Sequence, residues 1–151
     1  MNTQKNNEND LALKLFVVLN KAAREIADRV ESDMRSHGLN PTEFQVLELL
    51  YHKGDQPIQQ IGKRVLLASG SITYVVDRLE QKGYLERRSC PKDRRVTYAA
   101  ITTNGKTLMD DIFPRHREAL EEMFSVLDND EKATMIDKLK KLGLFVKDID
   151  A

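Results

Sequence analysis

Apolar side chains recur at three- and four-residue steps from Leu11 to about Arg35, which predicts a long amphipathic helix that His37-Gly38 ends. Residues 1 to 10 are polar and rich in Asn, and we expect them to be disordered because they have nothing to bury. From Leu11 to Leu19 every residue except Lys14 is apolar, which is more than one buried stripe requires. This excess predicts that a second subunit covers the helix.

Three shorter helices are predicted next, over residues 41–53, 58–65 and 69–82. Pro41 suits a first turn, and the hydroxyl of Thr42 is the candidate cap of the first of them. Ser69 is the candidate cap of the third, which Gly83 ends. Because only residues 66–68 separate the second helix from the third, the two form a helix-turn-helix candidate.

After Gly83 the period changes from helical to alternating. Residues 84–88 and 95–101 are rich in β-forming side chains and flank the turn-forming segment Ser89 to Arg94, which predicts a β-hairpin.

Two long helices are predicted after the hairpin. Thr102 or Thr103 can cap the first, which runs to about Leu127 and which Pro114 should kink. Asp128 can cap the second.

This order of elements predicts a mainly α fold with a small β-hairpin wing, in which a winged helix-turn-helix lies between helical arms. The lobe covers residues 40–105, and the arms cover residues 11–36 and 106–148 of one domain that spans residues 11–148. Both arms carry more apolar surface than a small domain can bury, so we expect them to form a two-fold homodimer. Such symmetry would place two recognition helices on one face of DNA, about 34 to 36 Å apart or further.

The composition fits a single soluble domain. The chain has 151 residues, of which 40% are apolar and 32% are charged, a balance that can close a core. One Cys cannot form an internal disulfide, and no apolar run approaches the ~20 residues of a membrane span or follows the pattern of a secretory signal. We therefore expect a cytoplasmic protein with no membrane partner.

Charge is unevenly distributed although the net charge is zero. Residues 54–105 carry 9 basic and 5 acidic side chains, whereas the segments on either side are net acidic. The excess is densest in the hairpin, whose basic residues are Arg87, Arg88, Lys92, Arg94 and Arg95, with Asp93 as a lone acid between them. This density is typical of an element that faces phosphates, and a solvated charged loop is the alternative.

The hairpin residues have different expected roles. Arg94 is expected to enter a minor groove, where the negative potential favours Arg. Contacts to phosphates are expected from Lys92, Arg87 and Arg88. Asp93 more plausibly orients an Arg than touches DNA, and a structural ion pair between Asp93 and Arg95 is compatible with this role.

The third short helix has two unlike faces. Its inward face is expected to consist of Ile72, Val75, Val76 and Leu79. Hydroxyl groups on the outward face can reach phosphates or base edges, and Arg can pair with guanine in the major groove. The candidates for DNA contact are Ser69, Ser71, Thr73, Tyr74 and Arg78. An ordinary solvent face, with Ser69 acting only as a cap, is the alternative.

Several motifs together resemble the MarR family of bacterial transcriptional regulators. They are the run Asn40 to Leu47, the segment Asp77-Arg78-Leu79-Glu80 with Lys82-Gly83, and the wing segment Pro91-Lys92-Asp93-Arg94-Arg95 followed by Ile101-Thr102 and Gly105. The resemblance covers about residues 11–148. Within the family, the chain is most similar to the subgroup that represses quinone, hydroquinone and catechol detoxification genes. The family's usual Asp before the wing Pro is Cys90 here.

The resemblance implies a repressor of detoxification or stress genes that binds a pseudo-palindromic site on double-stranded DNA as a homodimer. It also implies release by a small phenolic or quinone-type inducer, bound where the arms meet the lobe, and it implies no cofactor. Candidate lining residues are Phe16, Phe44, Tyr51, His52, Phe113 and His116. Core packing is the alternative for each of them.

Cys90 is a candidate redox sensor because the surrounding cations would stabilise a thiolate. A tolerated surface thiol is the plainer interpretation, since one Cys has no intramolecular resolving partner.

The sequence shows no catalytic motif, so we do not expect an enzyme. His37, His52 and His116 are isolated and match no metal-binding spacing, and neither a phosphate-binding loop nor a nucleophile elbow is present. The alternatives to a DNA-binding regulator are a winged-helix protein-interaction module without DNA binding and a small hydrolase or metalloenzyme.

Overall fold

The computed structural model, which describes residues 2–65 and 71–149, begins with helix α1 (Asn2–Ser36). This helix starts at Asn2 rather than at Leu11, which corrects the expectation that residues 1 to 10 are disordered. Extending an existing helix fixes one residue for each added hydrogen bond, so a polar segment can continue a helix that apolar residues have nucleated.

The end of α1 lies where the sequence predicts it. Gly38 adopts a φ of 81°, and the N–H of Leu39 donates to the carbonyl of Met34 at 3.2 Å. This is the Schellman arrangement, in which a residue with positive φ lets the chain turn back and satisfy the last carbonyls of the helix. Met34 and Leu39 are both buried, so the turn also closes an apolar contact.

Helix α2 (Pro41–Lys53) is capped by Asn40 and not by Thr42, which corrects the predicted cap. The Asn40 side chain accepts the N–H of Glu43 at 2.8 Å, and the Glu43 carboxylate accepts the N–H of Asn40 at 3.1 Å. Because Pro41 occupies the first helical position, the cap is the residue before it, and Thr42 lies buried inside the first turn.

The next two helices are α3 (Ile58–Arg64) and α4 (Ile72–Gln81). The hydroxyl of Ser71 caps α4 by accepting the N–H of Tyr74 at 3.4 Å, so the predicted cap is corrected from Ser69 to Ser71. Ser69 itself and the predicted link at residues 66–68 lie outside the described residues.

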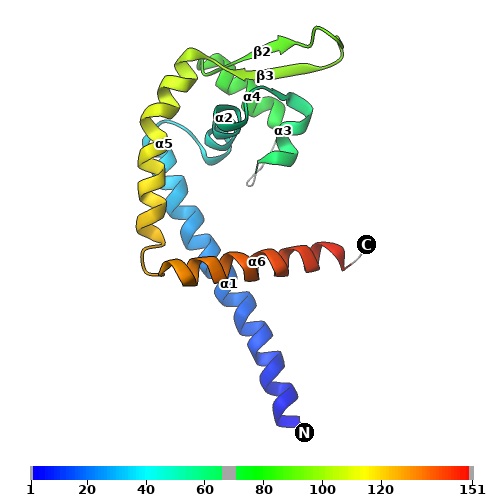
Figure 1. Ribbon diagram of the computed structural model, residues 1–151, viewed down its shortest axis with the longest axis vertical. Coiled ribbons are helices and arrows are strands. Elements are labelled where there is room, and N and C mark those ends of the chain that lie inside the picture. The colour runs from blue at the N-terminus through cyan, green and yellow to red at the C-terminus, as the bar shows by residue number, and fades with distance from the viewer. Residues whose placement is uncertain (1, 66–70, 150–151) are drawn as a thin grey trace. The chain divides into compact units, whose positions relative to one another are not determined.

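A three-stranded antiparallel sheet has the strand order β1-β3-β2, with β1 (Gln56–Pro57), β2 (Leu85–Ser89) and β3 (Thr97–Ile101). Strands β2 and β3 form the predicted hairpin, which runs past α4 with its turn at the end away from α5 (Figure 1). Strand β1 was not predicted, because two residues that include a Pro give no alternating pattern.

Helix α5 (Thr103–Met123) continues through Pro114, and helix α6 (Asn129–Asp148) follows. Thr102 caps α5 as predicted, since its hydroxyl accepts the N–H of Gly105 at 3.1 Å. Asp128 caps α6 as predicted, in a capping box with Glu131.

The chain forms two compact units, Met1–Pro114 and Arg115–Ala151. None of the described helices is long and apolar enough to cross a membrane.

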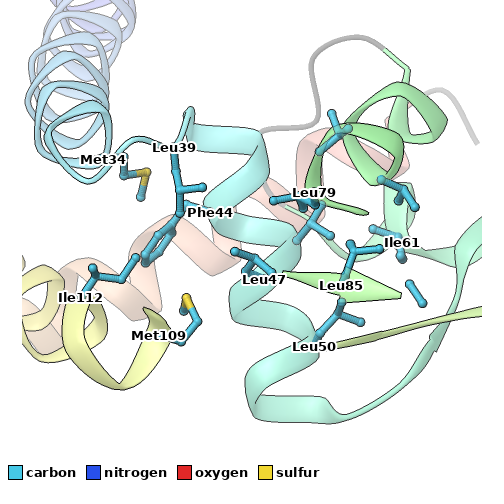
Figure 2. Packing of buried hydrophobic residues seen from close by; sticks show 14 residues of the cluster. Met34, Leu39, Phe44, Leu47, Leu50, Ile61, Leu79, Leu85, Met109 and Ile112 are labelled. Atoms are coloured by element: carbon cyan, nitrogen blue, oxygen red, sulfur yellow. The ribbon is translucent and has the colours of Figure 1, made fainter. Parts of the chain in front are cut away.

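One apolar cluster holds the first unit together (Figure 2). Helix α2 supplies several of its members, and the others come from the end of α1 and the turn after it, from α3, α4 and α5, and from strands β2 and β3. The labelled residues are Met34, Leu39, Phe44, Leu47, Leu50, Ile61, Leu79, Leu85, Met109 and Ile112. Because α2 contacts α4 through this cluster, packing fixes which face of α4 points outward.

Other apolar side chains remain exposed. On α1 they include Leu11, Leu13, Leu15, Phe16, Val17 and Val18. On α6 they include Met135, Ile136, Leu139, Leu142, Leu144, Phe145 and Val146. None of the described residues of α6 is buried. Such contiguous apolar surface is typical of an interface.

Gly105 lies where the chain passes from the hairpin into α5. A Cβ atom at this position would lie 2.2 Å from the carbonyl oxygen of Tyr84, an oxygen that accepts the N–H of Thr102 at 3.0 Å. We therefore expect Gly105→Ala to lower the free energy of unfolding by about 1–3 kcal/mol, as overpacking does. Thermal denaturation measures this change. Asn104→Ala alters an exposed side chain in the same turn and is the control, and equal melting temperatures for the two variants would contradict the prediction.

Candidate nucleic-acid interface

The outward face of α4 is as predicted. Val75, Val76 and Leu79 are buried, and Ile72 packs against the core from its edge. Ser71, Thr73, Tyr74 and Arg78 are exposed, and 59% of the Tyr74 surface is accessible. The helix thus offers hydroxyl groups, a phenol ring and a guanidinium, which can hydrogen-bond to base edges or phosphates.

Tyr74 and Arg78 form one unit on this face. Arg78 Nη1 donates to Tyr74 Oη at 3.3 Å, and the guanidinium carbon lies 5.9 Å from the centre of the Tyr74 ring. The hydrogen bond that Arg78 donates to Tyr74 raises the pKa of Arg78, so the guanidinium keeps its charge. An Arg held by a neighbouring ring is partly ordered before it meets a base.

The turn of the hairpin is closed by hydrogen bonds near Asp93. The backbone N–H of Arg95 donates to Asp93 Oδ1 at 3.0 Å, and Arg95 Nε donates to the same oxygen at 3.2 Å. The predicted ion pair of Asp93 with Arg95 is therefore present, and Asp93 orients an Arg as expected. Lys92 and Arg94 are exposed and have no ion-pair partner within residues 2–65 and 71–149.

Arg87 and Arg88, by contrast, are already paired with carboxylates. Arg87 binds Asp77, and it also binds Glu80 at 2.7 Å, so it joins β2 to α4. Its hydrogen bond to Asp77 raises the pKa of the guanidinium. Arg88 binds Glu86 at 2.6 Å and lies 3.4 Å from an oxygen of Asp55. The phosphate contacts predicted for Arg87 and Arg88 would thus compete with internal ion pairs. Lys92 and Arg94 are the hairpin cations that pair with no carboxylate among the described residues.

Three of the predicted ligand-site residues lie together between α2 and α5. The rings of His52 and Phe113 meet edge to face with centroids 4.7 Å apart, and the rings of Tyr51 and His52 do so at 5.1 Å. Tyr51 Oη donates to Asp110 Oδ1, and this hydrogen bond raises the pKa of Tyr51, so the phenol stays protonated at neutral pH. We call Tyr51, His52, Asp110 and Phe113 the aromatic cluster.

The other predicted ligand-site residues differ in their exposure. Phe44 is a buried member of the core. Phe16 lies on α1 with 67% of its surface exposed, and His116 is buried.

Cys90 is half-buried at the hairpin, and its backbone N–H donates to the carbonyl of Val96 at 3.1 Å. Among the described residues, no group of three or more His, Cys, Asp or Glu side chains could hold a metal ion.

Sequence reasoning missed the acidic partners in the first unit. Asp77, Glu80 and Asp110 each pair with a residue on another element. Glu43 pairs with Lys82, which is 39 positions away. The spacing Asn40 to Glu43 could have revealed a capping box, but nothing in the sequence indicates the pairs between elements.

Comparison with known proteins decides between the remaining interpretations. The model of the MarR family matches residues 39–97. The chain is 58% identical to the HTH-type transcriptional regulator MhqR of Bacillus subtilis (strain 168) over 136 residues, which cover 90% of this chain and 94% of that protein. The chain belongs to the MarR family. It is a DNA-binding transcriptional regulator, and its relatives are regulators rather than enzymes.

Solved structures of this family have the same fold. Sco3205 of Streptomyces coelicolor, a MarR family transcriptional regulator solved in complex with DNA, matches with a TM-score of 0.80 and 19% identity, covering 95% of this chain and 91% of that one. BpsR of Bordetella bronchiseptica, whose DNA binding is regulated by 6-hydroxynicotinic acid, matches with a TM-score of 0.76 and 20% identity, covering 85% and 92%. Both contain the winged-helix architecture described above.

Arg94 is the residue whose removal should report most directly on contact of the wing with DNA. Because its charge is unpaired among the described residues, Arg94→Ala should weaken operator binding by about tenfold and reduce the slope of log affinity against log salt by about one. Fluorescence anisotropy at several salt concentrations measures both. Arg117→Ala, which removes the same charge from an exposed position on α5, is the control, and unchanged affinity of a folded Arg94→Ala protein would reject the predicted contact.

Proposed function

We propose that this MarR-family regulator is a repressor that binds a pseudo-palindromic operator as a homodimer and leaves it when a small phenolic or quinone-type inducer binds. The observation that carries the proposal is that one lobe presents both an exposed Tyr74–Arg78 unit on α4 and, at the hairpin turn, cations that form no ion pair with any described residue. Helix α4 is suited to the major groove, and the hairpin turn is suited to an adjacent minor groove or to phosphates.

Exposed apolar surface supports the homodimer. The large apolar residues of α1 from Leu11 to Val18 have between 47% and 67% of their surface exposed, and α6 carries a second exposed apolar face. A second copy is the occupant that symmetry favours, because most soluble homo-oligomers are closed two-fold assemblies. Two copies of α4 would then meet successive turns of one face of the DNA.

The aromatic cluster supports a phenolic inducer. A phenol ring could pack against the edges of His52 and Phe113 while its hydroxyl donates to Asp110, the acceptor that Tyr51 uses in the free protein. The aromatic effector of BpsR, 6-hydroxynicotinic acid, shows that a structural neighbour responds to a ligand of this size. Because α2 supplies Tyr51 and His52 of this cluster and also packs against α4, a ligand here would bias the placement of α4.

Selection of genomic DNA fragments by the purified protein tests the proposal, followed by transcription from the selected promoter with and without the protein. We expect an inverted repeat near detoxification genes and lower transcription when the protein is present. Enrichment of no sequence would contradict operator binding, and increased transcription would contradict repression.

The dimer depends on the apolar face of α6. Leu139→Glu places a charge on that face, so the mass in solution should fall from twice 17.3 kDa to 17.3 kDa, and operator affinity should fall with it. Light scattering coupled to gel filtration gives the mass. Lys140→Gln changes the net charge by the same amount at an adjacent exposed position and should remain dimeric. A wild-type mass of 17.3 kDa would overturn the dimer.

The inducer site depends on Asp110. Asp110→Ala removes a charged acceptor and should raise the dissociation constant of catechol or hydroquinone by about tenfold, since hydrogen bonds to charged groups contribute about 1.5–3 kcal/mol. Isothermal titration calorimetry measures this constant, and Asp111→Ala, which removes the neighbouring carboxylate, is the control. Equal constants for wild type and Asp110→Ala would exclude the cluster as the site.

If Cys90→Ser abolished the response to inducer, the Cys90 thiol and not the aromatic cluster would sense the inducer.

A further inference from the structure

A buried ion pair joins the C-terminal end of α4 to the start of α2. Lys82 Nζ lies 2.7 Å from Glu43 Oε2, and only 3% of the Glu43 side chain and 28% of the Lys82 side chain are exposed. Lys82 also donates to the carbonyl oxygen of Gly38 at 3.2 Å. The ammonium group of Lys82, the residue that follows α4, therefore connects the end of α4 to the turn after α1 and to the first turn of α2.

Both oxygens of the Glu43 carboxylate accept hydrogen bonds in this arrangement. Its Oε1 accepts the N–H of Asn40 at 3.1 Å in the capping box, and its Oε2 accepts from Lys82. A buried carboxylate needs both a cation and hydrogen bonds. Here the cation is Lys82, at the end of α4, the helix proposed to enter the major groove.

The end of α4 does not need the side chain of Lys82 for capping, because the backbone N–H of Lys82, its C-cap residue, donates to the carbonyl of Arg78. Gly83 adopts a φ of 81°, its N–H donates to Glu80 at 3.0 Å, and the N–H of Tyr84 donates to Leu79 at 3.0 Å. The last carbonyls are thus satisfied by the backbone. Buried ion pairs contribute little net stability compared with apolar side chains, and their best-attested role is to select one register of packing.

We propose that Lys82 and Glu43 are positioning residues, which fix α4 against α2 and thereby set operator affinity without contacting DNA. The inference rests on the proposed entry of α4 into the major groove. A surface that recognises bases must be held within about 0.5 Å to make its hydrogen bonds. Because the ion pair of Lys82 with Glu43 fixes one end of α4, the helix would lose contacts with bases if this ion pair were removed. Lys82 lies in the net basic segment of residues 54–105, yet Glu43 neutralises its charge inside the lobe.

Two Lys→Met variants separate positioning from phosphate contact. Each removes one positive charge, but Lys82 is paired with a buried carboxylate, whereas Lys92 is exposed and unpaired among the described residues. Loss of a phosphate contact weakens binding to all sequences alike and lowers the salt slope by about one. Lys92→Met should behave in this way.

Lys82→Met should instead reduce affinity for the selected operator by about tenfold or more, change affinity for unrelated duplex DNA by less than twofold, and leave the salt slope unchanged. Lys82→Arg, which retains the charge, should restore most of the operator affinity. Fluorescence anisotropy on the two duplexes at four salt concentrations provides all these values for the full-length protein.

A lowered salt slope for Lys82→Met, with equal losses on both duplexes, would show that Lys82 contacts phosphate and would overturn the proposal. Unchanged operator affinity would also overturn it. If Lys82→Met does not fold, the double variant Glu43→Gln with Lys82→Met leaves no buried charge, and the same selective loss is expected. Failure of the wild-type protein to prefer any operator would instead reject the proposed function on which the inference rests.

Discussion

Burial of one face of α4 against α2 determines what this protein can present to DNA. Val76 and Leu79 are inaccessible because they meet the core that Phe44 and Leu47 build from the other side. Once these side chains are buried, the helical period forces Tyr74 and Arg78 to the outside. The hairpin depends on the same core, since Leu85 of β2 belongs to it.

The electrostatics of the lobe follow from how its cations are shared between internal and external partners. Arg87 joins the hairpin to α4, Lys82 joins α4 to α2, and Arg95 stabilises the turn through Asp93. A count of basic residues therefore overstates the charge available to a phosphate. The cations without ion-pair partners in the described part of the hairpin are Lys92 and Arg94, which lie at its turn.

The sequence predicts most elements because their signals are local. Period, glycines and capping residues were sufficient for the helices, the hairpin, and the caps at Thr102 and Asp128. Local signals were ambiguous where two capping residues stood close together, and the structure uses Asn40 instead of Thr42. Contacts between elements could not be predicted from the sequence, because the approach of Glu43 to Lys82 depends on how α2 packs on α4.

Chemical interference footprinting on the selected operator would test most directly whether α4 occupies the major groove and the hairpin the minor groove. Methylation of guanine N7 blocks contacts in the major groove, and methylation of adenine N3 blocks contacts in the minor groove. We expect interference at guanine N7 in each half-site, with interference at adenine N3 beside it where Arg94 enters. Interference at guanine N7 alone would contradict the placement of the wing, and interference at adenine N3 alone would contradict the placement of α4.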